Sequence, residues 1–186
     1  MIRFLVDSSW LLVVRIFLLI LFVSSCFVSC NNNKADQQTQ FSETQIEEHF
    51  INANKILVKN ELGEIEKYIA AHHDSMESTG SGLRYRIYSK GKGEKAGIGK
   101  IVSIKYSVSL MNGGVCYSSK EKGLLCFNIG KGETIKGLEE GVSLLTLGDK
   151  AVFIIPSHLA YGIQGDDNKI PGRASLVYDV ELIDVK

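Results

Sequence analysis

The spacing of hydrophobic residues divides the chain into a helical part and a strand-rich part. Between residues 42 and 72, apolar positions recur every three or four residues, which is the period of an amphipathic helix. Ser42 and Gln45 form a capping box that predicts the start of this segment. Because Gly63 predicts a break, we expect two helices, at 43–59 and 62–72, within a helical extension at 41–78. Their narrow apolar stripe is suited to a dimer through residues 43–72, to packing on the following domain, or to a spacer arm.

After the Ser/Gly-rich stretch at 78–82, the period changes to two, which is typical of β-strands. Further strands are predicted at 101–110, 115–118, 124–129, 149–156 and 174–185, with a hairpin turn at Asn112-Gly113 and one helix at 137–145. So many strands with one short helix can bury a core only if the sheet wraps over that helix. The fold class that we predict is therefore α+β, an antiparallel sheet over one short helix, preceded by an N-terminal helical segment.

The amino terminus has the pattern of an export signal. An unbroken apolar run, Ile16–Val23, follows Arg15 and precedes small residues and then a polar tether, so we predict a signal peptide at 1–29 and a tether at 30–40. Small residues before a cysteine resemble a bacterial lipobox, whose cysteine is lipidated after cleavage. We favour Cys30, at the switch from apolar to polar sequence, with Cys26 as the alternative. A signal anchor at 10–28 is a weaker alternative, because Arg15 interrupts it. The pattern predicts a lipid-anchored protein of the bacterial cell envelope, with its domain outside the cytoplasm.

Composition and charge exclude several kinds of function. Lys plus Arg and Asp plus Glu number 21 each, so the chain has no net charge that favours nucleic acid, and we expect no such partner. The acidic run at 165–168 lacks the ligand spacing of a calcium loop, and we interpret it as a solvated loop. The adjacent His72 and His73 point in different directions, and His158 has no triad partners. We therefore expect no metal and no cofactor.

Three segments in the last third of the chain carry a resemblance. These are Ile135-Lys-Gly-Leu-Glu-Glu-Gly141, Ala160-Tyr-Gly162 and Leu176–Leu182, in this order. Together they resemble an FK506-binding-protein (FKBP) type peptidyl-prolyl cis-trans isomerase, and the resemblance covers residues 82–186. It implies catalytic residues Tyr106, Ile135, Tyr161 and Tyr178, and substrate-binding residues Cys116, Tyr117, Leu125, Phe127, Thr134, Leu138 and Ile170.

The resemblance also implies a reaction and its partners. The substrates would be proline-containing segments of exported proteins, whose X-Pro bonds rotate against a barrier of ~18–20 kcal/mol. An apolar pocket that binds the twisted amide more tightly than the planar one lowers this barrier without covalent or acid/base chemistry. The backbone amide of Ile135 and the hydroxyl of Tyr161 would hold substrate carbonyls. Membrane contact would come through the lipid anchor.

Two positions depart from the family pattern. Cys116 and Tyr117 stand where the family usually has phenylalanine and aspartate, so a non-catalytic peptide-binding chaperone or an envelope structural module remains an alternative. With the lipobox and the segment 76–85, residues 114–117 resemble the narrower group of gliding-motility-associated FKBP lipoproteins. The alignment to the family puts Cys116 inward and Cys126 outward, which disfavours a disulfide between them.

Overall fold

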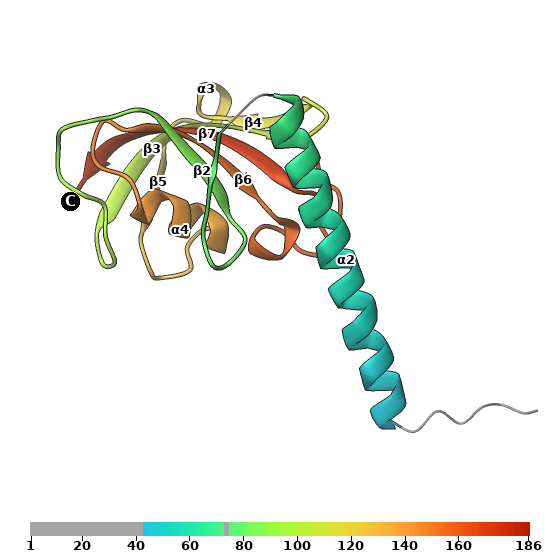
Figure 1. Ribbon diagram of the computed structural model, residues 1–186. Coiled ribbons are helices and arrows are strands. Elements are labelled where there is room, and N and C mark those ends of the chain that lie inside the picture. The colour runs from blue at the N-terminus through green and yellow to red at the C-terminus, as the bar shows by residue number, and fades with distance from the viewer. Residues whose placement is uncertain (1–42, 73–74) are drawn as a thin grey trace, which may run out of the picture. The chain divides into compact units, whose positions relative to one another are not determined.

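The protein, in a computed structural model that describes residues 43–72 and 75–186, is a curved antiparallel sheet with a short helix beneath it and a long helix before it (Figure 1). In chain order, its elements are α2 (Glu43–Ala71), β1 (Glu77–Ser78), β2 (Arg84–Ser89), β3 (Ile101–Leu110), β4 (Val115–Ser118), α3 (Ser119–Lys122), β5 (Leu125–Asn128), α4 (Lys136–Ser143), β6 (Lys150–Ile155), η1 (Ser157–Leu159) and β7 (Leu176–Val185).

The sheet has the strand order β1-β2-β6-β7-β3-β4, with β5 also paired to β3. Its named pairs are antiparallel, and the longest joins β3 to β7, from Val102 opposite Val185 to Leu110 opposite Leu176. The turn predicted at Asn112-Gly113 joins β3 to β4, and Gly113 takes the positive φ of 89° that such a turn requires. The predicted α+β fold is confirmed.

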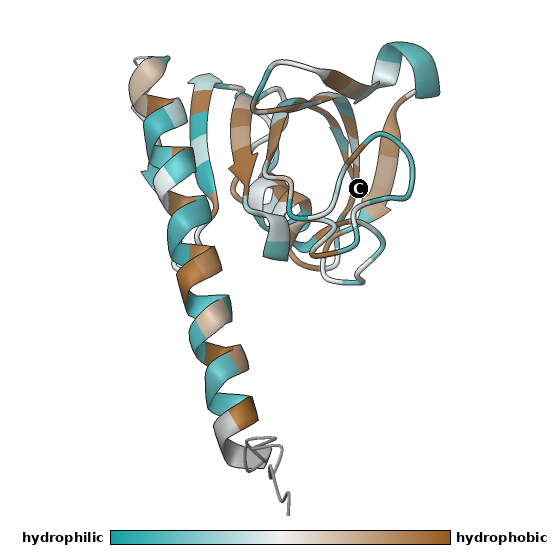
Figure 2. Cartoon of the chain, turned by 90° about the vertical axis from the view of Figure 1, so that its right-hand side faces the viewer, coloured by the Kyte–Doolittle hydropathy of each residue, from teal (hydrophilic) through white to brown (hydrophobic). Residues whose placement is uncertain are grey.

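The core lies between the sheet and α4. On β7, Leu176, Tyr178, Val180 and Leu182 are buried and alternate with more exposed residues, as expected for a strand with one face on a core. Brown, hydrophobic bands recur along the strands in Figure 2. Helix α4 can pack closely against β6 because Gly137 has no side chain. A Cβ at this position would lie 2.3 Å from the Ile155 side chain. This close approach brings the start of α4 to the wall of a pocket.

The prediction of two helices before the domain is wrong, because α2 runs without interruption from Glu43 to Ala71. Gly63 lies inside it, although glycine costs about 1 kcal/mol relative to alanine in a helix. The segment after Glu61 gains contacts that offset this cost: Ile65 is 0% exposed, and Arg84 donates to the Glu66 carboxylate at 2.7 Å. The helical extension ends earlier than expected, since Glu77 and Ser78 pair with β2 as a short strand.

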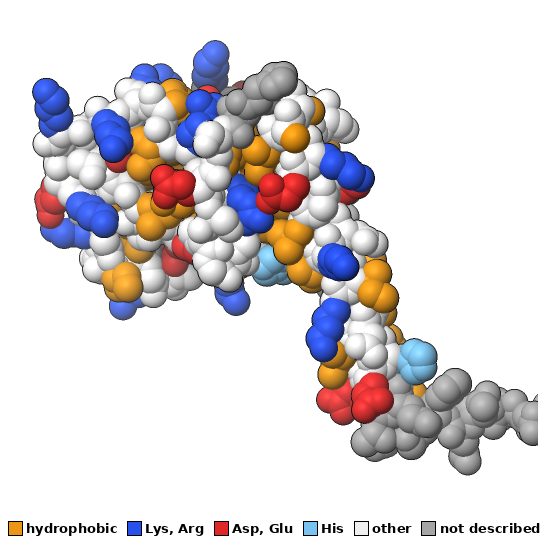
Figure 3. All heavy atoms as spheres, in the orientation of Figure 1, with side chains coloured by type: hydrophobic (Ala, Val, Ile, Leu, Met, Phe, Trp, Pro, Cys, Tyr) orange, Lys and Arg blue, Asp and Glu red, His pale blue; other side chains and the backbone are white. Residues whose placement is uncertain are grey.

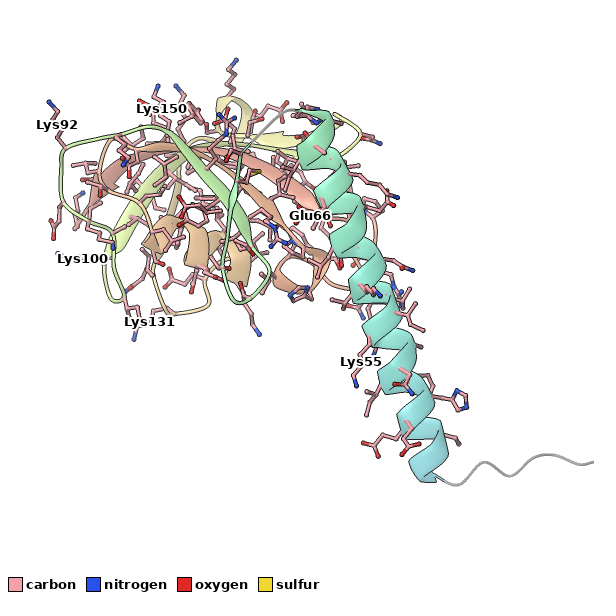
Figure 4. All side chains as sticks on the ribbon, viewed as in Figure 1. Lys55, Glu66, Lys92, Lys100, Lys131 and Lys150 are labelled. Carbon is pink, nitrogen blue, oxygen red and sulfur yellow. The ribbon has the colours of Figure 1, made fainter. Side chains whose placement is uncertain are left out.

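Glu61 joins α2 to the loop that follows β6. Its carboxylate accepts hydrogen bonds from the Ser157 backbone N–H at 2.6 Å, the Ser157 hydroxyl at 2.9 Å and the Ser175 hydroxyl at 2.6 Å. Figure 4 labels Glu66 one turn further along, where α2 lies beside the domain, and Lys55 on the part of α2 that extends past it. Residues 46–60 are exposed, so only the second half of α2 contributes to the folded core.

The remaining structural predictions have mixed outcomes. The signal peptide, the lipidated cysteine, the tether and the cap at Ser42 lie outside the described residues. Within the described ranges, no helix combines the length and hydrophobicity needed to cross a membrane. Cys116 is buried, Cys126 is exposed, and both are free thiols, so the disulfide that the alignment disfavoured is not formed.

Candidate active site

The structure gathers ten of the eleven predicted site residues into one hydrophobic cluster, which we call the cup. Its floor belongs to the hydrophobic core and consists of side chains that are at most 4% exposed: Cys116, Phe127, Leu138, Ile170 and Tyr178. Half-buried side chains pack against this floor and form the rim: Tyr106, Tyr117, Leu125, Ile135 and Tyr161. Ten of the eleven predicted residues therefore belong to one cluster, although they come from strands, a helix and loops far apart in the chain.

The eleventh residue, Thr134, lies at the mouth of this cup. With Ile135, Ala160 and Tyr161 it lines a hollow of about 500 Å³ between the start of α4 and the loop after η1. Ile135 has an extended backbone (φ −63°, ψ 142°) and directly precedes the first turn of α4. Backbone N–H groups at a helix start have no partner within the helix, so this position can donate a hydrogen bond to a carbonyl in the hollow.

Three tyrosines supply the polar part of the cup. The rings of Tyr106 and Tyr178 are stacked with their centroids 6.4 Å apart. The Tyr161 and Tyr178 hydroxyls lie close enough for each to influence the pKa of the other. The backbone of Tyr106 is held from α3, where the Ser119 hydroxyl accepts from its N–H at 3.1 Å and donates to its carbonyl at 3.2 Å. The hydroxyls are therefore pre-positioned on an otherwise apolar surface.

These phenols stay protonated at neutral pH. Burial raises the pKa of Tyr106, of Tyr161 and, most strongly, of Tyr178, and it also raises the pKa of the Cys116 thiol. A phenol that keeps its proton donates a hydrogen bond but does not act as a base. The cup can therefore hold carbonyl oxygens and apolar rings, and it has no activated nucleophile.

A carboxylate enters the rim from a position that the sequence analysis missed. The Tyr117 hydroxyl donates to one oxygen of Asp166, and the other oxygen accepts from the backbone N–H groups of Ile170 at 2.7 Å and Asn168 at 3.0 Å. Lys122 lies over the Tyr117 ring, 4.1 Å from its centroid. We call the pair Tyr117 and Asp166 the latch, because it ties β4 to the loop that carries Ile170.

The latch changes the interpretation of the acidic run as a solvated loop for Asp166, whereas Asp167 and Asn168 are exposed as predicted. Burial raises the pKa of Asp166, but the hydrogen bonds from Tyr117, Ile170 and Asn168 outweigh this effect and hold the pKa below its ordinary value. The hydrogen bond to Asp166 raises the pKa of Tyr117. The pattern Asp-x-Asn before Ile-Pro-Gly is typical of an aspartate that turns back on its own backbone, and this signal could have identified Asp166.

His158 and His72 are both exposed. The Nε2 of His158 lies 3.1 Å from the Ser81 carbonyl oxygen. His72 directly follows α2, and its Nδ1 lies 2.8 Å from the Tyr68 carbonyl oxygen. Among the residues that the structure describes, no cluster of His, Cys, Asp and Glu could hold a metal ion.

Comparison with known proteins agrees with this geometry. Residues 92–183 match the model of the family described as FKBP-type peptidyl-prolyl cis-trans isomerase. The chain is 44% identical over 94 residues to peptidyl-prolyl cis-trans isomerase FPR2 of Saccharomyces cerevisiae, covering 50% of this chain and 70% of that protein. The chain belongs to the FKBP family. The family match lies within the region 82–186 that carried the sequence resemblance.

Other FKBP relatives match more of the chain. A probable FKBP-type isomerase FkpA of Neisseria meningitidis is 38% identical over 141 residues, or 75% of this chain, and this chain spans 50% of its length. The crystal structure of FkpA from Escherichia coli has a TM-score of 0.58 at 28% identity, covering 79% of this chain and 74% of that one. These matches extend into α2, since they cover more than the globular domain alone.

Proposed function

We propose that the protein is a peptidyl-prolyl cis-trans isomerase that acts on X-Pro bonds of exported proteins. The observation that carries this proposal is the cup itself, an apolar floor of core residues with the protonated hydroxyls of Tyr161 and Tyr178 at its polar side. A proline ring fits an apolar floor, and a phenol can hold the adjacent carbonyl. Membership of the FKBP family supports the same reaction.

The proposed mechanism is differential binding. Rotation about the X-Pro bond breaks amide resonance and reduces the charge separation of the amide. A cup from which water is excluded favours this less polar, twisted form over either planar isomer. No proton transfer is required, which agrees with the raised pKa values of the tyrosines. The latch completes the rim at the position where Tyr117 replaces the usual aspartate.

A coupled assay with a proline-containing tetrapeptide tests the reaction. The full chain, purified in a mild detergent, should accelerate isomerisation, and Ile135→Asp should abolish most of this acceleration. If the wild-type protein does not accelerate the reaction at high concentration but still binds unfolded protein, the isomerase proposal fails and the non-catalytic chaperone is supported.

The proposed location is the bacterial cell envelope, with a lipid on Cys30 or Cys26. Its support is the sequence pattern of an apolar run, small residues and a cysteine before a polar tether. Labelling cells with a radioactive fatty acid should mark the protein, and Cys30→Ser should remove the label while Cys26→Ser retains it. The reverse result would assign the lipid to Cys26, and an unlabelled wild type would refute the anchor.

We also propose that the chain dimerises through residues 43–72. Its support is the exposure of large apolar side chains on α2, among them Ile46 at 43% and Phe50 at 67%. Hydrophobic atoms, in orange, recur along α2 in Figure 3. Sedimentation analysis should show a dimer that Phe50→Ser weakens, whereas a wild-type monomer at high concentration would refute it.

A further inference from the structure

A groove between α2 and the loop after η1 lies next to the cup. It has a volume of about 410 Å³, and Leu57 and Val58 of α2 line one side while Ser157, His158 and Ile163 line the other. The apolar walls are open to solvent, with Ile163 71% exposed, Leu57 41% and Val58 38%. Apolar surface kept in contact with water at a defined hollow is characteristic of a binding site.

The walls of this groove are built into the fold. The three hydrogen bonds of Glu61 join α2 to Ser157 and Ser175. On the loop side, the Arg173 N–H donates to the Gly162 carbonyl at 2.7 Å, directly before Ile163. A Cβ on Gly172 would lie 2.1 Å from the Ile163 carbonyl oxygen, so two backbone segments cross here in close contact. The exposed isoleucine is therefore held in a fixed position.

The groove is continuous with the cup. His158 lines both the groove and the hollow that contains Thr134, Ile135 and Tyr161. Gly162, at the edge of the groove, follows Tyr161 directly in the chain. On the far side, Asn54 and Val58 line both the groove and a shallow hollow on α2 that includes Ile51 and Lys55. Figure 3 shows hydrophobic atoms gathered where α2 meets the domain.

This arrangement suits one kind of occupant. A polypeptide whose proline sits in the cup can leave it in an extended form, and an extended chain advances about 3.3 Å per residue. A path past Tyr161 and His158 brings a residue several positions away into the groove. The Glu61 carboxylate is committed to three hydrogen bonds, whereas Arg173 and Lys55 add positive charge. The chemistry favours an apolar side chain without a cationic neighbour.

We propose that this groove is a secondary binding site for the same substrate chain, which holds an apolar residue several positions from the isomerised proline. The proposal rests on the isomerase function proposed above and adds the substrate class: unfolded segments in which a large apolar residue and a proline are separated by a defined spacing. Short peptides reach the cup alone, whereas longer segments engage both sites.

Peptides of twelve residues with one central proline test this proposal. Leucine is moved along an otherwise Ser/Gly background, on both sides of the proline, and kcat/KM is measured with the full chain in detergent. At one or two positions, leucine should lower KM and so raise kcat/KM roughly tenfold. Burying a leucine side chain strengthens binding by about a factor of ten or more. No position with a gain would overturn the proposal.

Two variants and two controls locate the effect. Val58→Ser and Ile163→Ser should each remove most of the leucine-dependent gain and leave the tetrapeptide rate unchanged. The controls are Ile56→Ser, on α2 but outside the groove, and Ile98→Ser, on a remote loop. Both replace exposed isoleucines, which are 60% and 88% exposed. Both variants should keep the leucine-dependent gain. An equal loss in these controls, or an equal slowing of the tetrapeptide, would overturn the proposal.

The outcomes distinguish failure of the isomerase function from failure of the secondary site. They also show whether a second copy of the chain occupies the groove. A wild-type protein that fails on the tetrapeptide refutes the isomerase function itself, whereas one that turns over the tetrapeptide without any leucine-dependent gain refutes only the secondary site. If Val58→Ser and Ile163→Ser convert a dimer to a monomer in sedimentation analysis, the groove is occupied by a second copy of the chain, and the substrate proposal is overturned.

Discussion

The floor and the rim of the cup differ in what holds them. The floor consists of side chains at most 4% exposed that also form the core, such as Leu138 at 0%. The rim consists of half-buried side chains that pack against the floor, and one of them, Tyr117, is tied to Asp166 by the latch. The floor therefore serves stability and binding together, whereas the rim can change, as at Tyr117, without loss of the fold. Substitutions in the floor should therefore lower stability most, whereas substitutions in the rim should lower turnover most.

The largest effect is expected in the floor. Leu138→Ala removes a fully buried side chain from the core and should lower the free energy of unfolding by about 3 kcal/mol. Urea denaturation monitored by circular dichroism measures this change. Lys136→Ala, on the exposed side of the same helix, should alter it by no more than about 0.5 kcal/mol. Equal effects of the two would show that the floor is not part of the core.

A charge at the rim should affect turnover more than stability. Ile135→Asp places a carboxylate at the half-buried mouth of the cup, so kcat/KM for an X-Pro tetrapeptide should fall at least roughly tenfold. The unfolding free energy should change by only about 1 kcal/mol. If the variant unfolds as readily as Leu138→Ala, the distinction between floor and rim fails.

Removing one hydroxyl from the rim should have an intermediate effect. Tyr161→Phe keeps the ring but loses the hydroxyl proposed to hold a substrate carbonyl, and kcat/KM should fall roughly fivefold to tenfold. Tyr88→Phe is the matched control, since its hydroxyl bonds to Asp179 and is not a member of the cup. Equal activity of wild type and Tyr161→Phe would exclude the hydroxyl from substrate binding.

The latch should behave as one unit. Tyr117→Phe and Asp166→Asn should each lower kcat/KM roughly twofold to fivefold, and the double variant should lose no more than the larger single loss, because both changes remove the same interaction. Asp167→Asn, the exposed neighbour, serves as control and should retain full activity. Losses that multiply in the double variant would show that the two residues act independently.

The smallest effect should be that of pH. Because the cup tyrosines have raised pKa values, kcat/KM should be constant from about pH 6 to pH 9. The pKa of Asp166 is lowered from 3.8 in the folded protein, so the latch is complete above the ordinary carboxyl range and is lost as pH falls through the lowered value. A bell-shaped profile near neutral pH would instead indicate an acid/base mechanism.

Much of the fold was predictable because local patterns determine strands and turns. The predicted strands at 101–110 and 115–118 coincide with β3 and β4, since alternating side chains and an Asn-Gly turn are properties of adjacent residues. The family resemblance supplied the predicted site residues, and ten of the eleven lie in one hydrophobic cluster. The break at Gly63 was predicted wrongly, because the local cost of glycine is offset by contacts that no local pattern reveals.

The sequence by itself determined the strand pattern, the short helix and the set of apolar and tyrosine residues that form the cup. The tertiary structure decided the connections between distant segments. The Tyr117–Asp166 bond joins residues 49 positions apart, and Glu61 reaches Ser157 across 96 positions. Such contacts depend on how the sheet curves and where α2 lies, and they leave no periodic signal in the chain. For this physical reason, the carboxylate in the rim and the groove beside the cup became visible only in three dimensions.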